Sequence, residues 1–362
     1  MAISTGDVVA RRSIAVLEEG QARSGAFVAS PSFPVYRYAW LRDGAFCAHA
    51  LDLVGKPDAA RAFHDWVAQS VELHRGMVES AIARIEDGET PPPEAMPPAR
   101  YTLDGTLEHP DEEPWPNFQV DGYGMWLWSL AEHLDGAVLS DERARTVELV
   151  AHYLRSSWGL RCFNCWEELD GGEHSSTLGA VVAGLEAAAR LLDSAEWEVA
   201  ADSVRSMLLE RFVTEGRFRR GPEDDRVDGS LLWLAVPFGV LPVSDPVIEA
   251  TVEAVRRDLT ASGGVYRYLG DSYYGGGEWL LLTSSLAWHD AVAGNLDAFE
   301  SAQEWVRAQA RENGDLPEQV SARAQQPGMV EPWLRRWGPV ATPLLWSHAM
   351  YLIAEIAALA RR

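Results

Sequence analysis

The sequence predicts an all-α protein built as a ring of inner and outer helices. Apolar residues recur at spacings of three and four along most of the chain, which is the period of an amphipathic helix. Clusters of Gly, Pro and Asp separate these runs, and the alternating pattern of a strand is scarce and short. Short turns join the expected helices in pairs, with longer loops at every second junction. Such pairs can close into a ring whose long loops gather at one rim.

Twelve helices are expected from this spacing. In chain order they cover residues 6–19, 42–54, 57–83, 121–135, 140–157, 174–193, 195–212, 227–237, 244–259, 278–293, 297–312 and 341–361. Two of the starts carry capping residues, because Ser140 precedes the acid Asp141 and Asn295 precedes Asp297. No change of composition divides the chain into two cores. A single domain over residues 1–362 is therefore expected.

The longest irregular stretch covers residues 84–120. It contains three prolines at 91–93 and an acidic run at 111–113. Loops longer than about 12–15 residues in a compact domain are usually functional or disordered. Residues 84–100 can equally be a solvated surface insertion. From Tyr101 onward aromatic residues return, so this part is expected to line a site.

Composition limits the possible partners and compartments. With 362 residues and 47% hydrophobic content, the chain can bury a large core. A formal charge of −23 disfavours nucleic acid and anionic membrane surfaces as partners. No segment approaches the roughly 20 apolar residues of a membrane span, and the N-terminus shows no secretory signal. Because three cysteines are too few for a disulfide scaffold, a cytoplasmic location is expected. The oligomeric state is left open.

Two short acidic motifs, far apart in the sequence, indicate the chemistry. Glu167 and Glu168 follow Trp166, and Glu318 follows a Leu-Pro pair. Glycoside hydrolysis uses paired carboxyl groups, one to protonate the leaving oxygen and one to activate water or attack carbon. The chain also has 15 Trp, many in polar-aromatic clusters that suit stacking on sugar rings. A small oligosaccharide is therefore the expected substrate.

Five sequence blocks resemble glycoside hydrolase family 15, the glucoamylase, glucodextranase and trehalase-like enzymes. The first block reads Tyr-Arg-Tyr-Ala-Trp-Leu-Arg-Asp and resembles the family pattern Tyr-x-Tyr-x-Trp-x-Arg-Asp. In chain order the blocks cover residues 36–43, 117–124, 166–168, 267–279 and 316–319 with 345–349. The resemblance spans nearly the whole chain. It implies an (α/α)6 barrel, which agrees with the twelve helices expected from the spacing.

The same resemblance implies an inverting mechanism that releases β-glucose. Glu167 would be the general acid and Glu318 the general base for a water on the far face of the terminal glucose. Inversion needs the two carboxyl groups about 6.5–9.5 Å apart, so that the water fits between them. Glu168 would bind substrate near the leaving group. Assignment of the acid to Glu168 remains the alternative.

The resemblance also implies a set of substrate-binding residues. Arg42 and Asp43 would clasp hydroxyls of the terminal sugar, which suits a carboxylate acceptor beside a forked donor. Tyr36 would hydrogen-bond the water, and Ser347 would lie near Glu318 and tune its protonation. Together with these, the expected binding residues are Tyr38, Trp40, Trp115, Gln119, Asp121, Trp166, Glu168, Arg267, Tyr273 and Trp346.

Other motifs favour a structural interpretation. Cys162 and Cys165 have the spacing of half a zinc site, but the chain has no second pair. The glycines at 275–277 are not preceded by a strand or followed by Lys-Ser/Thr, which disfavours a phosphate site. Tryptophans 126, 128 and 233 lie at helical spacing among leucines and are expected in the core. No metal ligand is expected, and no cofactor, because an acid, a base and a water complete the hydrolysis.

The expected substrate is a short α-1,6-linked glucoside such as isomaltose, cleaved from its non-reducing end. This preference depends on the helical region beginning within the first ten residues, which leaves no accessory domain to hold a polymer. An α-1,4-acting glucoamylase and an α,α-trehalase of the same family remain alternatives. A non-catalytic sugar-binding protein is a third alternative, although it would not need both Glu167 and Glu318.

Overall fold

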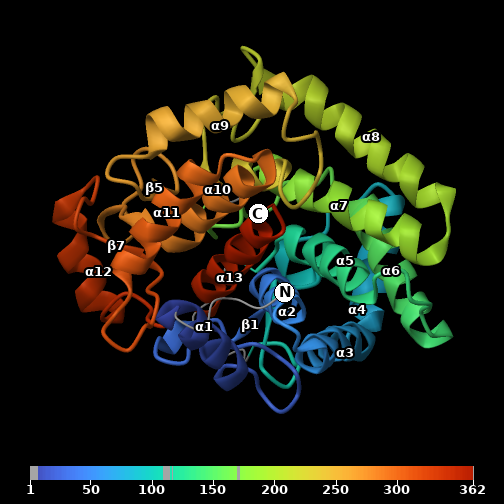
Figure 1. Cartoon of the computed structure of the whole chain (residues 1–362). Coiled ribbons are helices and arrows are strands. Elements are labelled where there is room, and N and C mark those ends of the chain that lie inside the picture. The colour runs from blue at the N-terminus through green and yellow to red at the C-terminus, as the bar shows by residue number, and fades with distance from the viewer. Residues whose placement is uncertain (1–6, 109–114, 116, 169–171, 362) are drawn as a thin grey trace.

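A computed structural model describes residues 7–108, 115, 117–168 and 172–361, and it shows a closed ring of helices around a central axis (Figure 1). Six helical segments form the inner ring, each in contact with the next, and the last returns to the first. These inner segments are α2 (Leu41–Leu53), α5 (Asp121–Leu134), α7 (Ser175–Leu192), η3 (Gly229–Leu234), α10 (Leu280–Ala293) and α13 (Leu345–Leu359).

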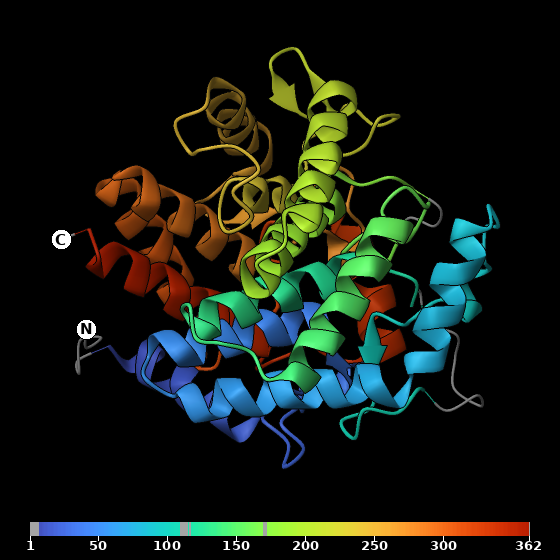
Figure 2. The same ribbon diagram turned by 90° about the vertical axis from the view of Figure 1, so that its right-hand side faces the viewer.

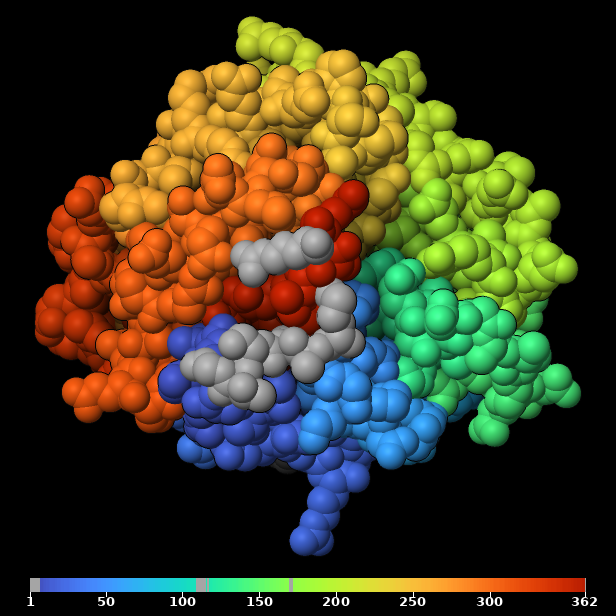
Figure 3. Space-filling view, viewed as in Figure 1, coloured from blue at the N-terminus to red at the C-terminus, as the bar shows by residue number. Residues whose placement is uncertain are grey.

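Six outer helices cover the inner ring. They are α1 (Val8–Glu19), α3 (Pro57–Leu73), α6 (Asp141–Ser157), α8 (Ala195–Phe212), α9 (Pro246–Leu259) and α11 (Leu296–Gln309). In Figure 3, red atoms of the C-terminal region are visible between the blue and orange segments, which agrees with a position of α13 inside the ring. Figure 2 shows the same arrangement from the side. The predicted all-α fold, an (α/α)6 barrel, is confirmed.

The inner helices are buried on all sides, which explains their composition of apolar and small residues. In α10, every residue from Leu280 to Ala291 is buried. Two of its hydroxyls form hydrogen bonds within the helix, since Thr283 and Ser285 donate to backbone carbonyls four residues earlier. The close crossing of α5 and α7 requires a glycine, because a Cβ at Gly124 would lie 2.2 Å from the carbonyl oxygen of Ala180.

Most helix positions match the prediction, and the cap at Ser140 is confirmed by its bond from the Arg143 N–H. Asn295 precedes α11, but its side chain makes no capping bond. The expected helix 57–83 is two helices, because the chain turns at His74 before α4 (Arg75–Glu86). The eighth expected helix, residues 227–237, is the shorter 3₁₀ segment η3. It ends before Pro237, and a proline disfavours helical geometry in the residue that precedes it.

One helix was not predicted. α12 (Val330–Trp337) has only eight residues and follows the short 3₁₀ turn η5 (Pro327–Met329). It lies between glycines 328 and 338 and contains Pro332, so the sequence there resembles a loop. A proline is tolerated in a first helical turn, where its missing N–H has no partner to lose.

Within the described residues 84–108, the expected loop contains more regular structure than predicted. α4 continues to Glu86, and η2 (Pro93–Ala95) follows. Strand β2 (Arg100–Tyr101) then pairs antiparallel with β1 (Ala39–Trp40). The acidic run at 111–113 lies outside the described residues.

Short strands join the loops that precede the inner helices. Strands β5 (Val265–Tyr266), β6 (Glu278–Trp279) and β7 (Gln319–Val320) form an antiparallel sheet in that order. A separate hairpin pairs β3 (Val213–Thr214) with β4 (Arg217–Phe218). Among the described helices, none has the length and apolar composition needed to cross a membrane.

Candidate active site

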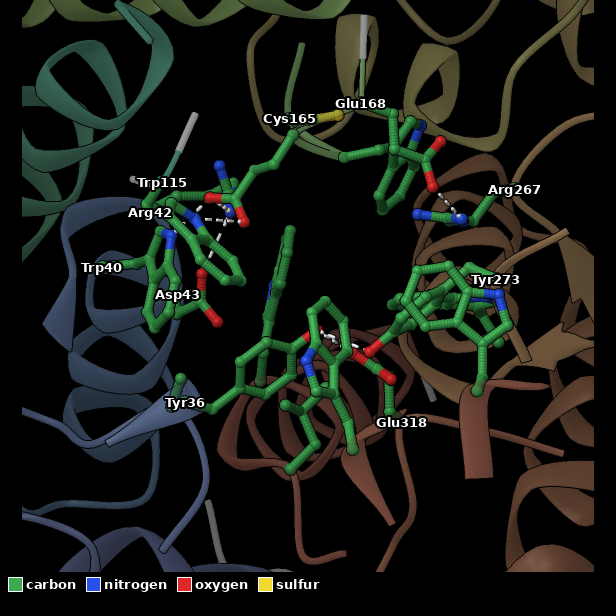
Figure 4. Close-up of a pocket in the computed structure, with 18 of the residues that line it drawn as sticks. Tyr36, Trp40, Arg42, Asp43, Trp115, Cys165, Glu168, Arg267, Tyr273 and Glu318 are labelled. Atoms are coloured by element: carbon green, nitrogen blue, oxygen red, sulfur yellow. Dashed lines mark hydrogen bonds and ion pairs between the residues drawn. The ribbon is translucent and has the colours of Figure 1, made fainter. Parts of the chain in front are cut away.

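A cavity opens at the end of the ring where the inner helices begin. Its walls come from the loops before α2, α5, α7, α10 and α13, from the first residues of α2 and α13, and from α12. The lining residues are Ala29, Tyr36, Trp40, Arg42, Asp43, Trp115, Cys165, Trp166, Glu167, Glu168, Arg267, Tyr273, Trp279, Glu318, Trp333, Arg336, Trp337, Leu344 and Trp346. Figure 4 shows these side chains arranged around an open centre.

Glu167 lies on a strained turn before α7. Its φ is 64°, in the left-handed region that residues with a Cβ rarely adopt. Asn164 holds the turn, since its carbonyl accepts from the Glu167 N–H at 2.9 Å and its side-chain oxygen from the Glu168 N–H at 3.1 Å. Strained backbone of this kind is found preferentially at functional sites, where the surrounding structure maintains it. The turn therefore presents the Glu167 carboxyl group to the cavity in a fixed position.

Three side chains donate hydrogen bonds to Glu167. Trp40 Nε1 and Gln119 Nε2 donate to Oε1, the second over 2.9 Å, and Trp115 Nε1 donates to Oε2 over 2.9 Å. Arg42 lies 3.6 Å from Oε1. These donors come from two separate segments, before α2 and before α5, so the orientation of the Glu167 carboxyl group depends on the folded ring.

Arg42 and Asp43, the second and third residues of α2, face the cavity together. Arg42 donates to Gln119 Oε1 over 2.6 Å, and its Nε lies 3.5 Å from Asp43 Oδ2. Burial raises the pKa of Asp43 to about 7, against the opposing effect of the Arg42 charge. Within the described chain, Arg42 Nε and Asp43 Oδ2 are buried without a hydrogen-bond partner. Both atoms are suited to bind the hydroxyls of a ligand.

Glu318 lies between the sheet and α13, and it is 2% exposed. Tyr36 donates from its hydroxyl to Glu318 Oε1 over 3.0 Å, and the Tyr36 and Tyr273 hydroxyls are 2.9 Å apart. Burial raises the pKa of Glu318 to about 8, although the bond from Tyr36 and the charge of Arg267 act in the opposite direction. Among the described residues no donor contacts its Oε2. That oxygen is the acceptor that a water in the cavity can use.

The three-stranded sheet brings Arg267 and Glu318 to the same wall. Arg267 follows β5, and Glu318 precedes β7. The guanidinium makes two bonds with Asp271, at 2.7 and 2.8 Å, and a third with Glu168 Oε1 at 2.6 Å. Tyr268 also donates to Glu168. Glu168 is thus engaged by Arg267 and Tyr268, whereas Glu167 contacts a different set of donors.

Four predicted site residues do not line the cavity. Gln119 bridges Arg42 and Glu167, and the fully buried Asp121 lies 3.6 Å from Arg42. Tyr38 packs its ring against the Arg100 guanidinium, 4.2 Å away. Ser347 was expected to lie near Glu318 and tune its protonation; its hydroxyl donates over 3.0 Å to the carbonyl of Pro317, the residue before Glu318. It holds the backbone before Glu318.

The residues that α12 contributes to the cavity were not predicted from the sequence. Trp333, Arg336 and Trp337 line the cavity, and the Trp337 ring lies 6.3 Å from that of Trp115. Arg100 was also missed, although it packs on Trp40 and Trp115 at 5.0 and 4.0 Å. The other missed lining residues are Ala29, Cys165, Trp279 and Leu344. Trp279 belongs to one of the recognised blocks, so its position in that block was an available signal.

Glu318 is expected to make the folded protein less stable as the pH rises. Its pKa increases from the ordinary value of 4.5 to about 8 on folding. Between these values the folded chain keeps a proton that the unfolded chain releases, so this contribution is complete below pH 4.5 and is lost as the pH rises through 8. Glu318→Gln removes the titration and should raise Tm more at pH 8 than at pH 5, by at least about 2 °C. An equal change in Tm at both pH values would contradict the buried, proton-retaining environment of Glu318.

The sequence matches Glycosyl hydrolases family 15 over residues 6–355. The chain belongs to this family. Isomaltose glucohydrolase from Kribbella flavida is 42% identical over 353 residues, which cover 95% of this family 15 chain and 91% of the relative. Trehalase 2 from Sulfolobus acidocaldarius is 24% identical over 280 residues, which cover 68% of the chain and 47% of that relative.

Solved structures agree with this assignment. A wild-type glycosidase superposes with a TM-score of 0.92 at 40% identity, over 99% of both chains. A variant glycosidase in complex with glucose gives a TM-score of 0.91 at 40% identity, over 99% of this chain and all of the other. A bacterial glucoamylase complexed with acarbose, at 21% identity and a TM-score of 0.75, shares the fold over 98% of this chain and 56% of its own. This family 15 chain is a glycoside hydrolase, and its substrate is a sugar.

Proposed function

We propose that this α-glucosidase of family 15 is an inverting, exo-acting enzyme that releases β-glucose from short α-1,6-linked glucosides such as isomaltose. The observation that carries the proposal is the presence of Glu167 and Glu318 in one cavity, in different environments. In Figure 4, Cys165 and Glu168, which flank Glu167, lie across the open centre from Glu318. Two carboxyl groups that face each other across a sugar ring serve both stereochemical outcomes, and we infer inversion because the unpaired Oε2 of Glu318 can accept a water.

In the proposed reaction Glu318 acts as the general base. Ionised Glu318 removes a proton from a water that its Oε2 accepts and that the Tyr36 hydroxyl helps to orient. The pKa of a base is best placed near the working pH, and burial moves that of Glu318 in this direction, to about 8. The water oxygen bonds to the anomeric carbon from the far face, so the configuration at that carbon inverts.

Glu167 acts as the general acid in the same step. Its proton passes to the glycosidic oxygen as the bond from that oxygen to the anomeric carbon breaks. The products are β-glucose and the shortened alcohol, and the next cycle begins when Glu167 regains a proton and Glu318 loses one. Trp115 is the donor to Glu167 Oε2, whereas Trp40 and Gln119 both donate to Oε1. The less crowded Oε2 is therefore the oxygen that we assign to the transferred proton.

The innermost part of the cavity fits a single terminal sugar. Buried polar atoms without a partner in the described chain include Arg42 Nε, Asp43 Oδ2, and the ring nitrogens of Trp279 and Trp346. The ring centroids of Trp346 and Phe46 lie 5.6 Å apart, and the inner helices close the ring behind these two side chains. A polyhydroxylated ligand satisfies these atoms, and a closed end limits attack to the end of a chain. The unpaired polar atoms and the closed end of the cavity together support exo-acting cleavage by a single catalytic domain.

The opening of the cavity supports a short leaving group. The residues there are Trp115 and, from α12, Trp333, Arg336 and Trp337. Glu168 and Arg267 form the adjacent wall. An aromatic surface beside charged groups suits one further sugar. The α-1,6 linkage is supported by the relative from Kribbella flavida, which is named an isomaltose glucohydrolase and is 42% identical over 95% of this chain. The relative named a trehalase is 24% identical over 68% of it.

A cytoplasmic location remains a proposal. It is supported by the cysteines at 47, 162 and 165, which are all free and buried. Cell fractionation with an antibody against the chain tests the location.

The linkage preference is tested by comparing kcat/KM for isomaltose, maltose and α,α-trehalose with the same enzyme preparation. We expect kcat/KM for isomaltose to exceed that for the other two by at least about tenfold, because even a small difference in fit changes transition-state binding by about 1–3 kcal/mol. A higher kcat/KM for maltose would indicate a glucoamylase, and a higher value for trehalose would indicate a trehalase.

A further inference from the structure

Two histidines and an aspartate converge at the end of the ring opposite the cavity. Asp52 is the second-last residue of α2, and His133 is the second-last residue of α5. His64 lies on α3, which packs outside both helices. At about 1.5 Å per residue, Asp52 is about 15 Å along α2 from Arg42 in the cavity. One potential ligand atom from each of the three side chains lies within 4.8 Å of the other two.

His64 is the unusual member of this cluster. It is 1% exposed, and neither ring nitrogen has a hydrogen-bond partner within the described part of the chain. Buried polar groups nearly always have a partner, so an imidazole with two unpaired nitrogens needs an explanation. A neutral imidazole has a lone pair available for a metal ion.

The other two side chains supply the remaining donors and a route for entry. His133 Nδ1 lies 2.8 Å from Asp52 Oδ2, and the rings of His64 and His133 are 5.0 Å apart. The side chains of His133 and Asp52 are 11% and 18% exposed, so an ion can reach the cluster from solvent. Two imidazoles and one carboxylate, with a water as the fourth ligand, are a typical donor set for zinc.

We propose that Asp52, His64 and His133 bind a zinc ion that ties the ends of α2 and α5 to α3. Tetrahedral coordination at about 2.0–2.2 Å places ligand atoms roughly 3.4 Å apart. On binding, the Asp52–His133 contact of 2.8 Å would lengthen and the wider separations, at most 4.8 Å, would shorten. The nearby positive charge of Arg143 is paired with Asp65. The net charge of −23 favours cations over the whole surface.

The test measures zinc binding to the whole enzyme after treatment with a chelator. Isothermal titration should give one ion per chain, and zinc should raise Tm. Cobalt, added alone, should give the visible absorption of a four-coordinate site. Asp52→Asn and His133→Gln change partly exposed ligands and are expected to fold, with zinc affinity lowered at least about tenfold. His152→Gln, which alters a half-buried histidine of α6 outside the cluster, is the matched control and should bind zinc normally.

Four results would overturn the proposal. Three of them are the absence of zinc binding, unchanged affinity in both Asp52→Asn and His133→Gln, and equal binding of magnesium, which prefers oxygen ligands. A fourth contrary result is zinc that inhibits hydrolysis without raising Tm, because such an ion would bind the carboxyl groups of the cavity. The site neither depends on the proposed substrate nor contributes to the reaction, so kcat in the Asp52 and His133 variants is expected to equal that of the unaltered enzyme.

Discussion

Glu318→Gln is expected to reduce kcat for isomaltose by about 10²–10⁴-fold, the usual effect of losing a general base. Glutamine keeps the shape of the side chain, and its carbonyl can still accept the bond from Tyr36. It cannot remove a proton from water. Glucose binding, measured by titration calorimetry, should therefore remain within a few-fold of that of the unaltered enzyme.

A matched control is available in the same sheet. Glu278 is also 2% exposed, lies on β6 beside β7, and bonds to Ser262 outside the cavity. Glu278→Gln makes the same chemical change at a similarly buried position and should retain most of the activity. Azide can replace the water in Glu318→Gln, because an anionic nucleophile needs no base, and the expected product is the β-glucosyl azide. Near-normal turnover by Glu318→Gln would show that the base is another group.

Glu167→Gln is expected to slow the hydrolysis of a substrate only where its leaving group must be protonated. Hydrolysis of isomaltose should fall by about 10²–10⁴-fold, because its leaving alkoxide requires a proton. Hydrolysis of α-glucosyl fluoride should stay within about tenfold of normal, since fluoride leaves without comparable protonation. Measuring kcat/KM for both substrates gives the result directly.

Glu168→Gln is the comparison that decides between neighbouring acids. Glu168 is engaged by Arg267 and Tyr268 on the leaving-group side, so its loss should raise KM for isomaltose, keep kcat for isomaltose within about tenfold of normal, and leave fluoride hydrolysis little changed. If Glu168→Gln, and not Glu167→Gln, loses kcat for isomaltose by about 10²-fold or more while it still hydrolyses the fluoride, the acid is Glu168. If both variants lose both substrates equally, the proposed division of roles is wrong.

Helices could be predicted well because their periodicity is local. The inner helices α5 and α10 and the cap at Ser140 follow from nearby residues, and the structure confirms them. α12 was missed because eight residues that include a proline and adjoin glycines carry too little periodic signal. The 3₁₀ geometry of η3 depends on its place between α7 and α10, which the spacing of its own residues does not encode.

The cavity could be predicted in part because short motifs keep its residues together. Arg42 and Asp43 are adjacent in the chain, and Glu167 follows Trp166, so recognition of the blocks found them. Contacts between distant segments carried no such signal. Arg100 reaches Trp40 across 60 positions through pairing of β1 with β2, and the Asp52–His64–His133 cluster combines three helices. Ser347 was placed correctly near the Glu318 segment, but its hydroxyl points to the backbone.

In the proposed reaction, Glu167 and Glu318 invert the anomeric carbon of an α-1,6-linked glucoside. Proton NMR of the anomeric signals during the first minutes of isomaltose hydrolysis shows the configuration of the released glucose, provided that sampling is faster than mutarotation. The glucose unit that leaves carries the equilibrium α/β mixture of the reducing end of isomaltose, so the result is the anomeric excess over that mixture in the free glucose. We expect an early excess of β-glucose that decays by mutarotation. An early excess of α-glucose would show retention and contradict the assignment of acid and base.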